Sequence, residues 1–246
     1  MARWRGMLMV AIVTLVAAPA AAQKIADAQS RREAIQFYRT GLEFFSSEKF
    51  DRAAEEFTKA TDKDPLFTLA YYQAGQSYMN LKRYASAIQT FQKCLEASRA
   101  LYGLAESNRF AVEKQREDDI HEMRESVKAL QSAGHALLAN RAEQHLADLE
   151  KQRTSLSGGY RPPAEVLLSL GSAFFRNGER DAAETEWKAA IEVNSKLGEA
   201  HNNLAVIYMT SGRYKEADAE VKAAEKTGFR VNPQFKEDLK KAAAGR

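Results

Sequence analysis

The chain has 246 residues, of which 45% are hydrophobic and 28% are charged, and its formal net charge is +3. This is the composition of an ordinary globular protein of one or two domains, and so small a charge excess excludes a general attraction to nucleic acid or anionic membranes. Only 5 prolines and 13 glycines occur. Good helix formers such as alanine, glutamate, lysine and leucine dominate, so the composition favours an all-α fold.

Residues 1–22 have the pattern of a secretory signal peptide. Arg3 and Arg5 give a basic start, residues 7–16 are almost purely apolar, and an Ala-x-Ala site ends at Ala22. The pattern predicts cleavage after Ala22 and export to the periplasm or another extracytoplasmic compartment. The alternative is an uncleaved membrane anchor, although the apolar run is short for a span of about 20 residues. Removing Arg3 and Arg5 leaves 34 of the 36 basic residues against 33 acidic ones.

Residues 30–98 contain two copies of one pattern, 34 residues apart. A glycine is followed three positions on by an aromatic residue, then by a small, an aromatic and another small residue at helical spacing. In each copy the pattern predicts two helices that approach closely at the small residues. A turn joins them, near residues 47–49 in the first copy and 81–83 in the second. The positions are Gly41, Phe44, Ala53, Phe57 and Ala60, then Gly75, Tyr78, Ala87, Phe91 and Cys94.

Cys94 is the only cysteine, so an intramolecular disulfide is excluded. It occupies the small-residue position that Ala60 fills in the first copy. We therefore expect Cys94 to be a buried packing residue without chemical reactivity.

Residues 99–163 form a densely charged insertion. Ile120, Met123, Val127 and Leu130 recur at spacings of three and four, as in a coiled coil. A single long helix and a helical hairpin that reverses near residues 132–134 both fit this pattern. A similar stripe follows at Leu138, Ala142, His145 or Leu146, and Leu149. The hairpin is favoured because it returns the chain toward the next repeat and buries both apolar stripes. A Gly- and Pro-containing linker follows at residues 155–163.

Polar residues of the insertion are predicted to be solvated helix surface. The stretch 113–119 mixes charges of both signs without interleaved aromatic residues, and His121-Glu122 has the same character. Such a surface is not a nucleic-acid site.

Residues 164–231 contain two further copies, again 34 residues apart, and residues 232–246 predict a last, capping helix. Asn232 and Pro233 form a helix start, and Phe235 and Leu239 are expected to face inward. The repeat positions are Gly171, Phe174, Ala183, Trp187 and Ala190, then Ala205, Tyr208, Ala217, Val221 and Ala224.

The four copies, at about 34–66, 68–98, 164–196 and 198–231, resemble the tetratricopeptide repeat (TPR). Pro65 matches the closing proline of that family in the first copy only, and Val221 replaces the usual aromatic residue in the fourth. With the signal peptide, the chain is similar to exported bacterial members of the family. The resemblance implies an all-α solenoid of two repeat pairs, separated by the insertion, that binds protein partners.

No catalytic motif is recognisable in the sequence. The histidines at positions 121, 135, 145 and 201 lack zinc-ligand spacing, and no phosphate loop, nucleophile elbow or dinucleotide fingerprint occurs. We therefore predict no enzyme activity, no cofactor, and no catalytic or metal-binding residue. His201, at the start of the fourth copy, is expected to be a polar groove residue.

The inner face of the first helices is the predicted partner-binding groove. External binding of a peptide or helix and internal coverage of this face by the insertion are equally compatible with the sequence. The expected function is that of a non-catalytic adaptor outside the cytoplasm, and the alternative is a structural protein that self-associates through the insertion. The predicted groove residues are Tyr38, Leu42, Phe45, Leu69, Tyr72, Gln76, Met79, Phe175, Asn202 and Val206.

Overall fold

The computed structural model describes residues 25–154 and 159–244, and every regular element in these ranges is an α-helix. The predicted signal peptide lies outside the described residues. No helix in the described ranges is long and apolar enough to cross a membrane. The helices are α1 (Ala28–Ser46), α2 (Phe50–Lys63), α3 (Thr68–Asn80), α4 (Tyr84–Ser107), α5 (Arg109–Ser132), α6 (Ala136–Thr154), α7 (Ala164–Asn177), α8 (Arg180–Val193), α9 (Gly198–Thr210), α10 (Tyr214–Lys226) and α11 (Pro233–Ala244).

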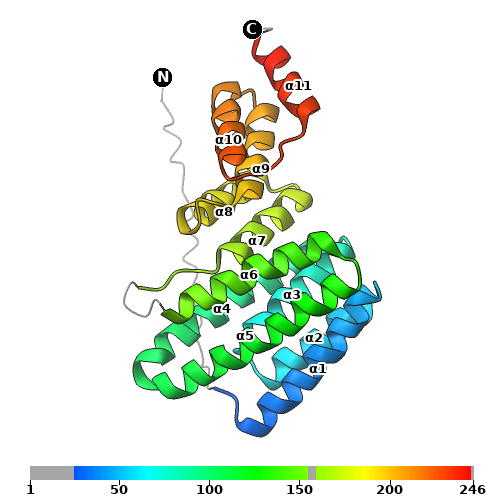
Figure 1. Cartoon of the computed structure of the whole chain (residues 1–246), viewed down its shortest axis with the longest axis vertical. Coiled ribbons are helices and arrows are strands. Elements are labelled where there is room, and N and C mark those ends of the chain that lie inside the picture. The colour runs from blue at the N-terminus through cyan, green and yellow to red at the C-terminus, as the bar shows by residue number, and fades with distance from the viewer. Residues whose placement is uncertain (1–24, 155–158, 245–246) are drawn as a thin grey trace, which may run out of the picture.

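The repeats form four antiparallel helix pairs, α1–α2, α3–α4, α7–α8 and α9–α10, which stack in chain order into a solenoid (Figure 1). The predicted all-α TPR solenoid is therefore confirmed. The turn inside each pair contains a residue with left-handed backbone at an equivalent position. Glycine adopts this conformation without a steric penalty, whereas Glu48 and Lys82 adopt it at some cost in free energy. The four residues are Glu48, Lys82, Gly178 and Gly212.

A glycine on the first helix and an aromatic ring on the second hold three of the four pairs in close contact. A Cβ atom added at these glycines would lie only 2.4–2.6 Å from the ring, so no larger residue fits without displacing it. This contact explains why the glycine and the aromatic residue recur together. The pairs are Gly41 with Phe57, Gly75 with Phe91, and Gly171 with Trp187.

The fourth repeat has Ala205 and Val221 at the two positions, and both lie in the core cluster of the C-terminal half. Here the extra methyl group of alanine is offset by the smaller side chain of valine. The smaller Val221 therefore makes room for the larger Ala205, and the two departures from the repeat pattern compensate for each other in volume.

The insertion is a hairpin of α5 and α6, not a single long helix. The chain reverses over Ala133, Gly134 and His135, where Gly134 has a φ of 77° and the His135 N–H donates to the Leu130 carbonyl at 3.0 Å. Helix α4 continues past residue 98, where the repeat pattern ends, because Leu101 extends a small core with Ala97 and Leu66.

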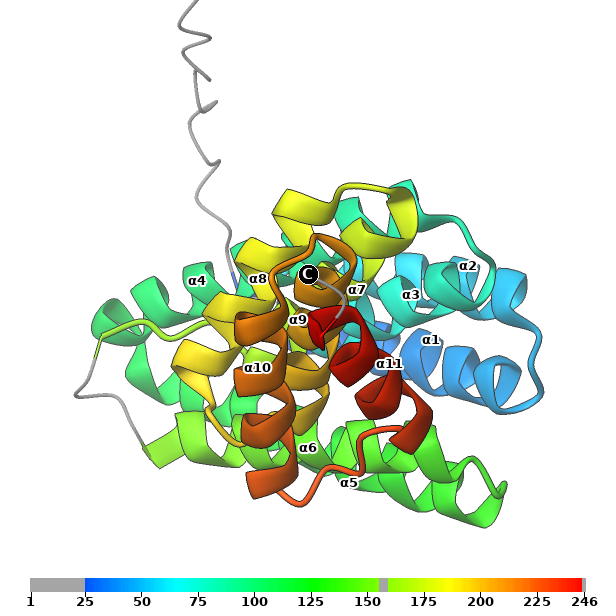
Figure 2. The ribbon, with the colours of Figure 1, turned by 90° about the horizontal axis from the view of Figure 1, so that it is seen from above.

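The hairpin lies across the first helices of repeats 1 and 2. Figure 1 shows α5 and α6 side by side in front of α1 and α3, and Figure 2 shows them as a layer along one side of the solenoid. Helices α7 to α11 extend beyond the hairpin, and α11 closes the C-terminal end. There Leu239 is buried and Phe235 packs against the same cluster, as predicted.

Candidate partner-binding groove

The ten predicted groove residues lie on the first helices α1, α3, α7 and α9, but they fall into two groups. Tyr38, Phe45, Leu69, Tyr72 and Gln76 are buried. The side chains of Leu42, Met79, Phe175, Asn202 and Val206 are only partly buried. The buried group lies entirely on α1 and α3, whereas the partly buried group includes Leu42 and Met79 of these helices together with the three predicted residues on α7 and α9.

The hairpin buries the groove face of repeats 1 and 2. Tyr38 and Leu69 are fully buried in one cluster with Met123 and Val127 of α5. On the next repeat, the Tyr72 ring stacks on the imidazole of His145, with ring centroids 4.5 Å apart. The sequence left open whether this face binds an external partner or is covered by the insertion. In repeats 1 and 2 the insertion covers it.

Five of the predicted partner-binding residues thus have no surface for a partner in this structure. For Tyr38, Phe45, Leu69 and Tyr72 the reason is packing within the chain, against the hairpin or the neighbouring helices. For Gln76 it is α7, since its side-chain amide donates to Ser169 Oγ at 2.9 Å.

A buried charge cluster joins the hairpin to the start of the solenoid. Arg31 of α1 donates to Asp64 at 2.6 Å and to Asp119 of α5, and its guanidinium lies 4.0 Å from the centre of the Phe67 ring. Burial raises the pKa of Asp119 to about 7, although the charge and hydrogen bond of Arg31 act in the opposite direction. One cation thus faces two carboxylates out of contact with solvent.

Further polar contacts follow the hairpin along α1. Arg39 donates to both carboxylate oxygens of Glu122, at 3.0 and 2.6 Å. Gln115 donates to the Leu66 carbonyl at 3.1 Å, and at the hairpin tip His135 Nε2 lies 3.0 Å from the Ser46 carbonyl oxygen. The hairpin is therefore fixed from its base to its tip.

These contacts correct the prediction that the charged stretch of the insertion is solvated. Gln115, Asp119 and Glu122 are buried, and only His121 of the pair His121-Glu122 is exposed. Their spacing of four and three places them on the same helical face as Met123. That spacing was the available signal, because polar residues in phase with an apolar stripe indicate a buried polar contact.

His201 is likewise not a groove residue. It is buried, its Nδ1 lies 2.6 Å from Glu220 Oε2, and its Nε2 lies 3.3 Å from the Ser195 carbonyl oxygen. The predicted burial of Cys94 is confirmed, since its side chain is inaccessible to solvent, and this burial raises the pKa of the thiol.

Leu42 is the one predicted residue of the first repeat that keeps an accessible surface. It lines an open cleft of about 640 Å³ between α1 and α5. Most other side chains of this cleft are polar or charged, so it is not a continuation of the apolar groove. The residues that line the cleft with Leu42 are Arg39, Glu43, Ser46, His121, Glu122, Glu125 and Ala129.

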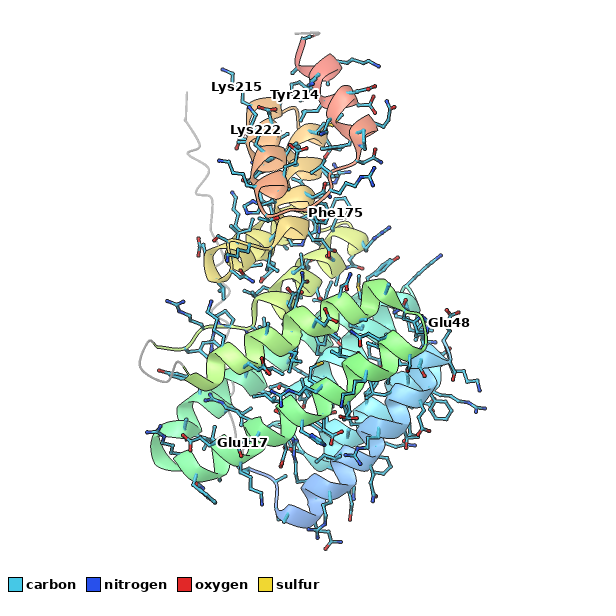
Figure 3. All side chains as sticks on the ribbon, in the orientation of Figure 1. Glu48, Glu117, Phe175, Tyr214, Lys215 and Lys222 are labelled. Atoms are coloured by element: carbon cyan, nitrogen blue, oxygen red, sulfur yellow. The ribbon has the colours of Figure 1, made fainter. Side chains whose placement is uncertain are left out.

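Repeats 3 and 4 present the uncovered part of the groove. Phe175 packs against Trp187, with centroids 5.7 Å apart, and lies on α7 above the hairpin (Figure 3). Asn202 and Val206 lie one turn apart on α9, and Met79 of repeat 2 lies on α3, the first helix before α7. A cavity of about 10 Å³ that Met79 lines with residues of α7 is too small to hold a side chain.

The described residues contain no group of three or more His, Cys, Asp or Glu side chains placed to hold a metal ion.

The family model of the tetratricopeptide repeat matches residues 38–102 and 168–228, on either side of the hairpin. No curated protein matches the chain in sequence.

Solved structures of similar fold share little sequence with the chain. PilW, a widely conserved type IV pilus biogenesis factor, is 16% identical, with 86% of each chain covered and a TM-score of 0.41. A thermophilic TPR protein of Thermus thermophilus is 20% identical, with 86% of this chain and 99% of that chain covered and a TM-score of 0.36. YrrB, a TPR protein with an unusual peptide-binding site, is 19% identical, with 87% and 95% covered and a TM-score of 0.31.

Likenesses this distant carry no argument about function. The family model rests on the repeats themselves, and its two matched ranges together span just over half of the residues. The chain therefore belongs to the tetratricopeptide-repeat family.

Proposed function

We propose that the protein is a non-catalytic adaptor that acts outside the cytoplasm and binds a peptide or helix of a protein partner in the groove of repeats 3 and 4. TPR proteins are protein-interaction modules, and a solenoid offers an extended concave surface for this purpose. The observation that carries the proposal is the partial exposure of Phe175, Asn202 and Val206 on two successive first helices, α7 and α9.

The chemistry of this surface suits a peptide or a helix. Phe175, Val206 and Met79 offer apolar contacts, and aromatic side chains contribute much of the affinity at interfaces. Asn202 carries both a donor and an acceptor, so it can pair with the backbone of a partner. The N-terminal signal pattern supports action outside the cytoplasm.

Replacing Phe175 and Val206 together by alanine is expected to weaken partner binding at least about tenfold, because truncating one well-packed interface residue costs roughly 1 kcal/mol or more. The test is quantitative cross-linking and mass spectrometry of the extracytoplasmic fraction, comparing the tagged wild type with the variant. Both side chains are partly exposed, so circular dichroism should show a folded variant.

Phe110→Ala is the matched control, because Phe110 is 80% exposed at the start of α5, outside the groove. The proposal predicts that this control keeps the partners that the double variant loses. Equal recovery of the same partners by all three proteins would contradict it.

A further inference from the structure

The hairpin contacts the groove of repeats 1 and 2 in the manner of a bound ligand. An apolar stripe on α5, which contains Met123 and Val127, fills the space over Tyr38 and Leu69. Two acidic residues at the edge of that stripe, Asp119 and Glu122, meet two arginines of α1. The groove therefore recognises a helix by an apolar stripe and by carboxylates one turn apart.

Several polar atoms of the hairpin are buried without a hydrogen bond. The hairpin buries Gln115 Oε1, Arg116 Nη1 and both ring nitrogens of His145 without a hydrogen-bond partner among the described residues. Each such group loses its hydrogen bonds to water without replacement, and this opposes docking. None of the unpartnered buried side-chain atoms of the described residues lies in α8 to α11. The hairpin is thus held less tightly than its apolar contacts alone would hold it.

The closest helix–helix contacts within the repeats do not include the hairpin. Both of its connections lie at one end, because α5 follows α4 after the single non-helical residue Asn108 and α6 leads back to α7. The close contacts within the repeats, such as Gly41 with Phe57, involve no residue of the hairpin. Undocking would uncover the sides of Tyr38, Leu69 and Tyr72 that face the hairpin and would leave these contacts within the repeats in place.

We propose that the groove of repeats 1 and 2 is a second binding site, specific for an amphipathic helix of a partner protein, and that the α5–α6 hairpin competes with this partner for the site. The partner helix carries acidic residues at positions i and i+3, equivalent to Asp119 and Glu122, which pair with Arg31 and Arg39. It carries apolar residues at i+4, i+8 and i+11, equivalent to Met123, Val127 and Leu130. This site is separate from the proposed site on repeats 3 and 4.

Competition with a tethered segment determines the affinity that an external helix shows. A segment attached by short connections has an effective concentration on the order of millimolar. The apparent affinity for an external helix is reduced by the fraction of molecules whose groove is occupied. Weakening the hairpin without changing the groove must therefore strengthen external binding.

The probe is a fluorescent peptide with the sequence of residues 109–132, added to the full-length protein and followed by anisotropy. Met123→Ala with Val127→Ala in the chain changes only the hairpin side of the contact. If the hairpin competes for the groove, this variant should bind the unchanged peptide at least about tenfold more tightly than the wild type does. Val127→Ala alone is the milder variant and should give a smaller increase.

A charge exchange tests the recognition itself. Arg39→Glu, in the background of the weakened hairpin, should weaken binding of the wild-type peptide, because it places two negative charges together. A peptide with Glu122→Lys should restore binding to that variant, because the ion pair is rebuilt with opposite polarity. The Arg39 side chain is 58% exposed, so its replacement leaves the solenoid folded, which circular dichroism checks.

The proposal would be overturned if weakening the hairpin did not raise the affinity for the peptide. It would also be overturned if the charge exchange left peptide binding unchanged. The pair Phe175→Ala and Val206→Ala, on the other half of the groove, should leave peptide binding unchanged. The two proposed sites can therefore fail independently of one another.

Discussion

Replacing Arg31 by methionine is expected to destabilise the protein by about 3–5 kcal/mol, because removing one partner of a buried ion pair leaves uncompensated charge in the interior. Among the described residues, Arg31 is the only cation that hydrogen-bonds to Asp64 and Asp119, and both carboxylates are essentially inaccessible to solvent. The loss should be concentrated in repeats 1 and 2 and the hairpin. Urea unfolding followed by circular dichroism measures it.

The destabilisation by Arg31→Met should increase with pH. Burial raises the pKa of Asp119 to about 7 in the folded protein, against about 3.9 in an unfolded chain. The folded state therefore binds this proton more tightly, so its contribution to stability is fully present below about pH 4 and is lost as the pH rises through 7. Without Arg31 this pKa rises further, so the variant should lose more stability at pH 8 than at pH 5.

Two variants act as controls for Arg31. Arg83→Met removes a surface ion pair with Asp51, in which both side chains are more than half exposed, and should cost about 1 kcal/mol or less. Adding Asp119→Asn to Arg31→Met should recover part of the lost stability and reduce its pH dependence. If Arg31→Met were no more harmful than Arg83→Met, the buried cluster would have no structural role.

Replacing Trp187 by alanine is expected to cost about 3–5 kcal/mol, as for other large aromatic residues in cores. The Trp187 side chain is 2% exposed, its indole N–H donates to the Leu168 carbonyl at 3.1 Å, and its ring lies directly against Gly171. The cavity would lie between α7 and α8, where the glycine has no side chain to fill it. A fall in melting temperature of about 10 °C should follow for a chain of this length.

Trp187→Phe is the matched control, since Phe57 and Phe91 fill the equivalent position in repeats 1 and 2. It keeps a ring over Gly171 and loses the indole hydrogen bond, so it should cost much less than alanine. Thermal unfolding of the three proteins makes the comparison. Equal losses for both variants would show that the ring over the glycine does not hold the repeat together.

The repeats could be predicted because each depends on residues close together in the sequence. Gly171 and Trp187 are sixteen positions apart, and their recurrence at a period of 34 residues identified the helix pairs and their turns. The hairpin was favoured for a similar reason, since its apolar stripes and the glycine at 134 are local features. Helix α4 extends beyond the repeat because Leu101 packs on Leu66, a distant contact that the repeat pattern does not contain.

The state of the candidate groove could not be predicted, because it depends on contacts between distant segments. Arg31 and Asp119 are 88 positions apart, and neither is distinguishable from a surface residue until α5 is placed over α1. Tyr38 and Tyr72 lie on the first helices, as predicted, but their exposure depends on where the hairpin packs as well as on the rings of their own repeats. Phe175, Asn202 and Val206 stay partly accessible, which likewise depends on how the distant segments pack.

The hairpin is docked in the groove of repeats 1 and 2, and NMR titration of His145 can test this arrangement. Docking buries His145 completely against Tyr72, and desolvation lowers the pKa of its imidazole to about 4, from an ordinary value of about 6.5. The resonance, assigned with a His145→Gln variant, should stay neutral through pH 6 and show contacts to the Tyr72 ring. A titration midpoint near pH 6.5, without contacts to the Tyr72 ring, would show that the hairpin is not docked in this groove.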